Sequence, residues 1–239
     1  MAVFGSGTKE LLVSEGIRPE RIVVTGNPKF DYLFSARGRD CKSKVCQRYM
    51  IPEDTNIILL LTDYLVEVGE WTSTKRRQFV LAICQAVSRL PQSKLIIKLH
   101  PAAEKESDYR EIVKDLTESP VICQNVSLWE LLHACNLAIT VLSGAGLEVM
   151  AAGKPLMIVN FFGEPEPFDE TSGATVVRKH EDLLPALEMM LYQGLSSEKK
   201  EAAREFVHRH AYIQDGKAAR RIADLIVKMA TESEDRRLT

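Results

Sequence analysis

Polar and small residues gather directly after four apolar, β-rich stretches of this 239-residue chain. Thr62 and Asp63 follow the first stretch, His100 the second, residues 143–148 the third and residues 162–166 the fourth. Hydroxyl, carboxylate, imidazole and backbone N–H groups can all hydrogen-bond to phosphates or sugar hydroxyls. If the four stretches are parallel strands, these residues meet at the sheet edge where open α/β folds bind ligands. We therefore expect one ligand site at that edge.

The segment Ser143-Gly-Ala-Gly-Leu-Glu148 lies between an expected strand and an expected helix. Its first residues are small, so backbone N–H groups at the helix start can approach an anion, and a phosphate or diphosphate is the natural occupant. These small residues are Ser143, Gly144, Ala145 and Gly146. Glu148 then offers two carboxylate oxygens to the vicinal hydroxyls of a ribose. A structural alternative stays open, in which Ser143 caps the helix, the glycines make the turn and Glu148 complements the helix dipole.

His100 ends an apolar run and is followed by Pro101. Because proline cannot continue a central strand, it stops the run and holds the imidazole at the rim of the sheet. A position beside the glycine turn favours a role for His100 in the ligand site. The alternatives are a structural hydrogen-bonding histidine, or a surface pair of Lys98 and His100 without function.

An acidic loop over residues 163–170 follows the last of the four stretches and contains two prolines. As a site, it offers carboxylates to sugar hydroxyls, with Glu166 and Asp169 as the candidates. In the alternative interpretation, the loop has no binding role and is a solvent-exposed connection between two elements. Both interpretations remain open from the sequence.

Composition excludes several classes of function. The chain has 31 lysine and arginine residues and 33 aspartate and glutamate residues, a formal net charge of −2. Its net charge therefore does not attract it to nucleic acid or to anionic membranes. The five cysteines are odd in number and scattered, which predicts no metal site, no disulfide framework and a reduced, cytoplasmic protein. No apolar run approaches the roughly 20 residues of a membrane span. The chain has neither a P-loop nor a G-x-S-x-G elbow, which argues against P-loop ATPases and α/β-hydrolases.

Short β-rich runs alternate with amphipathic helical segments, a pattern typical of α/β proteins. We expect a Rossmann-like parallel sheet with helices on both faces. The expected strands cover residues 22–25, 56–61, 94–99, 120–123, 137–142, 155–161 and 174–177. The expected helices cover residues 79–90, 108–116, 127–135, 146–152, 180–192, 197–210 and 217–231.

The chain divides into four parts. Residues 1–34 form one strand–helix–strand unit with too few elements to bury its own faces, so it must pack on something else. Residues 35–48 are expected to be a basic linker, residues 49–231 the main ligand-binding lobe with its trailing helices, and residues 232–239 a frayed tail.

Four stretches together resemble the GT-B glycosyltransferase superfamily, in particular its UDP-N-acetylglucosamine 2-epimerases and its capsule or teichoic-acid transferases. The stretches are residues 15–28, residues 98–101, residues 143–148 with 153–155, and residues 215–222. The resemblance runs from about residue 3 to residue 226. It corresponds to the C-terminal lobe of a GT-B fold with a remnant of the N-terminal lobe, the last βαβ unit, before it.

This resemblance implies that the ligand is a nucleotide sugar of the UDP or CMP type, with no other cofactor. Carried over by position, it implies that Ser143, Gly144 and Ala145 receive the diphosphate, that Glu148 binds the ribose, and that His100 lies beside the phosphates. His100 is thereby the one candidate for a catalytic role.

The resemblance also implies a glycosyltransferase or a 2-epimerase-like enzyme of glycan or polysaccharide biosynthesis. Since the N-terminal lobe of the superfamily brings the acceptor and usually the general base, the chain is expected to need an acceptor-lobe partner or a second copy. The alternative is a non-catalytic module that binds a nucleotide sugar or another protein. That alternative predicts an exposed apolar patch around Val3, Leu11, Leu12 and Val24.

Overall fold

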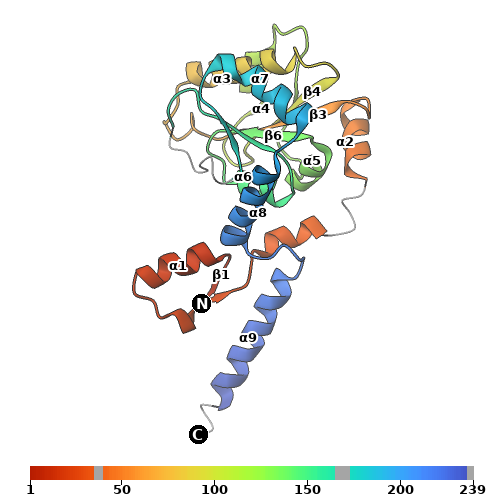
Figure 1. Ribbon diagram of the computed structural model, residues 1–239. Helices are drawn as coiled ribbons and strands as arrows, with labels where there is room; N and C mark the ends of the chain where they lie inside the picture. The colour runs from red at the N-terminus through yellow and green to blue at the C-terminus, as the bar shows by residue number, and fades with distance from the viewer. Residues whose placement is uncertain (35–39, 165–172, 236–239) are drawn as a thin grey trace. The chain divides into compact units, whose positions relative to one another are not determined.

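The computed structural model describes residues 1–34, 40–164 and 173–235 of the chain (Figure 1). The chain folds as two compact units. We call Met1–Ala36 with Arg204–Thr239 the terminal unit, and Arg37–Ala203 the central unit.

The central unit is built on one sheet of six strands, and every neighbouring pair is parallel, which confirms the expected α/β class. The order across the sheet is β5-β4-β3-β6-β7-β8. Each strand overlaps a stretch predicted from the sequence. The strands are β3 (Asn56–Leu61), β4 (Ser93–Lys98), β5 (Val121–Cys123), β6 (Leu137–Thr140), β7 (Leu156–Val159) and β8 (Thr175–Val177).

Helices pack on the sheet of the central unit (Figure 1). Residues of α3, α4 and α7 share one apolar cluster with the sheet. Of the other helices, α5 packs on β3, α6 packs on β7, and α2 packs on α5. The helices are α2 (Cys41–Tyr49), α3 (Ser73–Val87), α4 (Glu106–Val113), α5 (Leu128–Ala134), α6 (Ala145–Ala151) and α7 (His180–Glu188), which continues as a π-helix over Met189–Gln193.

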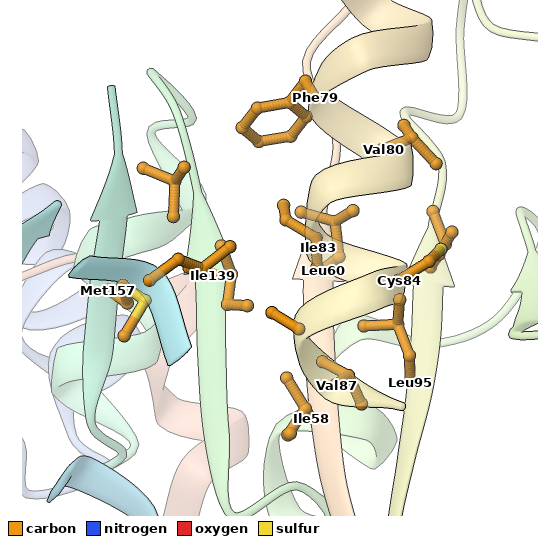
Figure 2. Packing of buried hydrophobic residues seen from close by; sticks show 14 of the residues in the cluster. Ile58, Leu60, Phe79, Val80, Ile83, Cys84, Val87, Leu95, Ile139 and Met157 are labelled. Carbon is orange, nitrogen blue, oxygen red and sulfur yellow. The ribbon is translucent and has the colours of Figure 1, made fainter. Parts of the chain in front are cut away.

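Strand β3 lies at the centre of the core. Ile57, Ile58, Leu59 and Leu60 are at most 1% exposed, so the strand is buried on both faces, as a continuous apolar run in a parallel sheet predicts. Ile58 and Leu60 face α3, whose Ile83 points at the strand from a stripe of apolar residues spaced three and four apart (Figure 2). This packing fixes the place where β3 and its neighbours end.

The terminal unit contains the predicted strand–helix–strand motif. Its two strands are parallel, with Ala2 opposite Val23. A helix from the far end of the sequence completes the unit: Asp31 accepts hydrogen bonds from the first two N–H groups of this helix, Ala218 at 3.0 Å and Ala219 at 2.8 Å. The elements are β1 (Ala2–Val3), α1 (Ser6–Ser14), β2 (Val23–Val24), α9 (Ala218–Asp235) and 3-10 turns at Pro19–Arg21 and Pro28–Phe34. Helix α8 (Ser197–Ala211) contains residues of both units.

The structure draws the boundaries differently from the sequence in two places. Residues 41–48, expected within a linker, belong to α2 because Val45 and Cys46 are buried; residues 35–39 lie outside the described residues. Residues 204–235 group with the terminal unit and not with the main lobe, since Arg221 Nε donates to the carbonyl of Thr25 at 2.7 Å. Residues 232–235 of the expected tail are the last residues of α9, and residues 236–239 lie outside the described residues.

The apolar patch expected for an interaction module does not form from its four predicted residues. Val3 is only 6% exposed, because it lies in the core of the terminal unit. Leu12 and Val24 are half-buried, and Leu11 alone among the four is well exposed, at 58%. No helix within residues 1–34, 40–164 or 173–235 combines the length and apolar content needed to cross a membrane.

Candidate functional site at the sheet edge

The chain reverses its direction across the sheet between β3 and β6. From β3 it proceeds through β4 to β5, and it then returns to the other side of β3 to form β6, β7 and β8. Ligands of open α/β sheets bind outside the carboxyl ends of the strands at such a switch point. Thr62 and Asp63 follow β3, and Ser143 and Gly144 follow β6, so these four predicted residues flank the switch point.

Asp63 fastens the two loops to each other. Its Oδ2 accepts a hydrogen bond from the N–H of Leu142 at 3.1 Å and lies 3.4 Å from the hydroxyl of Thr140. These bonds turn the chain after Thr140, which is why β6 ends two residues before the predicted strand does. Burial raises the pKa of Asp63, and the bonds from Leu142 and Thr140 act in the opposite direction. Asp63 therefore shapes the loop that leads to Ser143.

A buried carboxylate that the sequence did not single out, Glu104, joins the ends of β3 and β4. Glu104 is only 3% exposed. Its Oε2 accepts hydrogen bonds from the N–H of His100 at 2.7 Å and from the hydroxyl of Thr62. Its Oε1 accepts one from the hydroxyl of Tyr109 in α4. Burial raises the pKa of Glu104, and the three hydrogen bonds lower it.

The backbone and the ring of His100 are each held by neighbouring residues. Gln124, which follows β5, donates from Nε2 to the carbonyls of His100 at 2.9 Å and Glu104 at 2.7 Å. The ring lies against Tyr64, with centroids 4.4 Å apart. Nδ1 accepts a hydrogen bond from the N–H of Ala102 at 3.4 Å, so in the neutral ring the proton is assigned to Nε2. His100 is thus a half-buried, oriented hydrogen-bond donor at the rim of β4.

The loop before α6 presents backbone donors. Ser143 accepts two hydrogen bonds, through Oγ from the N–H of Ala145 at 3.3 Å and through its carbonyl from Gly146 at 2.9 Å. Within the described part of the chain, the N–H groups of Ser143 and Gly144 have no hydrogen-bond partner. Gly144 is exposed, and a Cβ added to it would meet no atom within 4 Å. Two adjacent N–H groups without a partner among the described residues therefore lie at the start of α6, beside the open space around Gly144.

Glu148 lies on α6 and is 6% exposed. Gly146, two residues before it and therefore on the opposite side of the helix, is also buried, so the first turn of α6 is covered on both sides. The predicted role of Glu148 in binding ribose stays a prediction.

The loop after β7 is anchored by Asn160, which the sequence did not identify, and by Glu164, which lies in the predicted set 162–166. The side chain of Asn160 makes two hydrogen bonds to the backbone of Glu164, both at 2.8 Å: Oδ1 accepts from its N–H and Nδ2 donates to its carbonyl. The carboxylate of Glu164 accepts from Nε1 of Trp71 at 2.6 Å and lies 3.6 Å from Nζ of Lys75. The two carboxylates predicted to bind sugar, Glu166 and Asp169, lie outside the described residues.

The four stretches that carry the family resemblance divide between the units. Residues 98–101 and 143–148 meet the carboxyl edge of the central sheet, whereas residues 15–28 and 215–222 belong to the terminal unit. There, Arg221 pairs with both oxygens of Asp215, at 2.8 and 2.9 Å. The Gly-Lys-Pro stretch is also structural, since Lys154 Nζ donates to the carbonyl of Cys135 at 2.8 Å.

Among the described residues, the structure contains no group of three or more histidine, cysteine, aspartate or glutamate side chains arranged to hold a metal ion. Sequence reasoning missed Glu104 and Gln124, and it placed Glu164 in the set 162–166 without assigning it a role of its own. Each is one polar residue in a polar loop, and only the folded geometry shows what it binds.

Comparison with known proteins identifies the family. A family model described as UDP-N-acetylglucosamine 2-epimerase matches residues 3–227. No curated protein sequence matches the chain. The UDP-GlcNAc 2-epimerase of Neisseria meningitidis, solved with UDP-GlcNAc, is 17% identical with a TM-score of 0.65, over 94% of this chain and 60% of that one.

Two further solved structures share the fold. The wall teichoic acid polymerase TagF is 16% identical with a TM-score of 0.68, over 97% of this chain and 56% of that one. Alr3699/HepE of Anabaena, solved with UDP-glucose, is 14% identical with a TM-score of 0.56, over 93% and 63%. The chain thus spans between 56% and 63% of the length of these relatives, as expected for one lobe of a GT-B fold with part of the other. With a family model matched over residues 3–227, the chain belongs to the UDP-N-acetylglucosamine 2-epimerase family.

Proposed function

We propose that the central unit binds the diphosphate of a nucleotide sugar at residues 143–146, beside His100. The observation that carries this proposal is the pair of N–H groups of Ser143 and Gly144, which have no partner in the described part of the chain and lie at the switch point beside the open space around Gly144. Diphosphate oxygens are strong acceptors for such groups at the start of a helix. The nucleotide sugars bound to two of the similar structures support the same ligand class.

The remaining predicted residues have defined parts in this proposal. Ala145 and Gly146 form the helix start beneath the diphosphate, and Glu148 accepts hydrogen bonds from the ribose. Thr62 and Asp63 act through the loops that they fasten. Glu166 and Asp169 are the candidates for the sugar hydroxyls, and the nucleotide is of the UDP or CMP type.

His100 is the candidate catalytic residue. When the bond between a sugar and a diphosphate breaks, negative charge grows on the diphosphate. The Nε2 proton of His100 and the N–H groups of residues 143 and 144 would stabilise that charge without having to reorient. Removing one preorganised donor of this kind typically lowers kcat by about 100- to 1,000-fold.

We infer further that turnover requires an acceptor lobe, supplied by a partner or by a second copy of the chain. This inference is supported by the chain's coverage of 60% of the Neisseria structure. The reaction is then a glycosyl transfer or a 2-epimerase-like isomerisation in cytoplasmic glycan or polysaccharide biosynthesis. An isomer-resolved assay on UDP-N-acetylglucosamine separates the two, and unaided turnover by a monomer would remove the need for a partner. Binding without turnover under all conditions would favour the non-catalytic module.

Calorimetry with a glycine variant tests the binding site. Gly144 has φ −55°, and a Cβ there meets no atom of the protein, so Gly144→Ala should fold like the wild type. The added methyl fills the space above the loop, and we expect UDP affinity to fall by about tenfold or more, roughly 1.4 kcal/mol. Ser88→Ala is the control, because Ser88 precedes β4 at the opposite edge of the sheet. Failure of the wild type to bind UDP, CDP or CMP, or equal UDP binding by Gly144→Ala, would contradict the proposal.

A further inference from the structure

Glu104 gathers donors from three separate elements. Thr62 follows β3, His100 follows β4, and Tyr109 lies within α4. Each donates a hydrogen bond to the same carboxylate, which is 3% exposed. A buried carboxylate shared in this way fixes the ends of two neighbouring strands relative to each other.

The three donors differ in what they can do without Glu104. The hydroxyls of Thr62 and Tyr109 can rotate towards other acceptors, whereas the N–H of His100 has a direction set by the backbone. Within the described residues, the other acceptor near that N–H is Thr62 Oγ1, at 3.2 Å. The backbone of His100 is therefore the group most dependent on Glu104.

Further groups hold Glu104 itself in place. The guanidinium of Arg76 lies over the ring of Tyr109, 5.2 Å from its centroid. Arg76 is in turn fixed by Glu67 at 2.7 Å and Asp108 at 3.3 Å. This buried arrangement limits the movement of Tyr109, and through it the movement of the carboxylate of Glu104.

We propose that Glu104 is a positioning residue that acts through His100: it fixes the backbone of His100 against the end of β3 and so aims the Nε2 proton at the diphosphate. The part of this proposal that concerns the ligand rests on the proposed function. The part that concerns the geometry of His100 does not need a ligand, so the two can fail separately.

The first experiment measures the tautomer of His100 by NMR of the imidazole nitrogens in the full chain without nucleotide. The chain has five histidines, and His100→Gln assigns the signal. We expect the Nε2-protonated form in the wild type and a shift towards a mixture of tautomers in Glu104→Ala. Glu104→Gln should keep the wild-type signal, since its amide oxygen accepts from His100 and its NH2 can donate to Tyr109. Glu111→Gln, at an exposed glutamate of α4, is the matched control.

The second experiment is a double-mutant cycle on UDP affinity. We expect Glu104→Ala to weaken UDP binding by about tenfold when His100 is present, and by less than about twofold in a His100→Ala background. Glu104→Gln should bind like the wild type. If Glu104→Ala does not fold, Glu104→Asp replaces it, because a side chain one methylene shorter cannot reach all three donors.

The outcomes separate the two hypotheses. An unchanged His100 signal in the Glu104 variant, or equal losses of affinity in both backgrounds, would overturn the positioning role. If the wild type binds no nucleotide, the proposed function fails, and the NMR measurement still decides whether Glu104 orients His100.

Discussion

Asp63 is a carboxylate kept largely from solvent at the boundary between β3 and β6. Burial raises its pKa above the ordinary value of 3.8, and hydrogen bonds from Leu142 and Thr140 only partly compensate. A carboxyl group whose pKa is raised by folding holds its proton more tightly in the folded chain. Its contribution to stability is therefore largest at low pH and is lost as the pH rises through the folded pKa.

Asp63→Asn should consequently stabilise the protein at neutral pH. The amide oxygen can still accept from Leu142, and no charge has to be buried. A gain of about 1 kcal/mol would raise Tm by about 2 to 4 °C for a chain of this length. Thermal unfolding from pH 7 to pH 4 measures the difference between variant and wild type, which should shrink as the pH falls. A difference that grows towards low pH would show that the charge of Asp63 stabilises the fold.

At the residue scale, sequence reasoning could find the groups that follow strands, but not the groups that hold them. Thr62, His100 and Ser143 each come directly after an apolar run, so their arrival at one sheet edge followed from strand direction alone. Glu104 lies in a polar run whose acidic residues look alike in sequence. Its burial arises from the path of the loop after His100, which no local pattern encodes.

At the element scale, α9 shows how a helix can be capped by a residue far away in sequence. Asp31 accepts from the N–H groups of Ala218 and Ala219, at 3.0 and 2.8 Å. Helix starts leave several N–H groups without intrahelical partners, and an acidic side chain there also complements the helix dipole. The sequence predicted the helix from its periodicity, but it could not reveal a cap 187 residues away.

Asp31→Ala should destabilise the protein by about 1 kcal/mol, the usual cost of losing a side-chain cap. Asp40→Ala is a matched control, because Asp40 stands at the N-cap of α2 without a side-chain hydrogen bond to it. Urea unfolding followed by circular dichroism compares the two variants. Equal effects of both substitutions would mean that the hydrogen bonds accepted by Asp31 contribute nothing to stability beyond its charge.

The linker expectation shows where local composition misleads. Residues 35–48 are rich in basic side chains, which indicates exposure, yet Val45 and Cys46 within α2 are almost fully buried. With Cys41, three apolar residues are buried in α2, and three in a short basic segment give too weak a period to predict a helix. Their burial is decided by the packing of α2 on α5, a contact between distant parts of the sequence.

At the scale of the whole molecule, the expected one-lobe architecture is confirmed, but the sequence misassigned the C-terminal helices. Residues 204–235 follow the main lobe in sequence and group with the N-terminal residues in space. Predicting this would have required knowing that Arg221 binds the carbonyl of Thr25 and that Asp31 caps α9. The residues proposed to bind the nucleotide all belong to the central unit. Nucleotide binding should therefore stabilise the central unit more than the terminal unit.

Hydrogen exchange can show this inequality. A ligand at 100 times its Kd stabilises the unit that binds it by about 2.7 kcal/mol, which slows exchange through unfolding of that unit by about 100-fold. We expect UDP to slow exchange in the core strands β3 and β6 of the central unit, while β2 and α9 of the terminal unit change little. At the same UDP concentration, a tenfold loss of affinity in Gly144→Ala should reduce the slowing to about tenfold, because its methyl occupies the phosphate space. Protection confined to the terminal unit, or spread evenly over both units, would place the nucleotide elsewhere or show that the two units unfold as one.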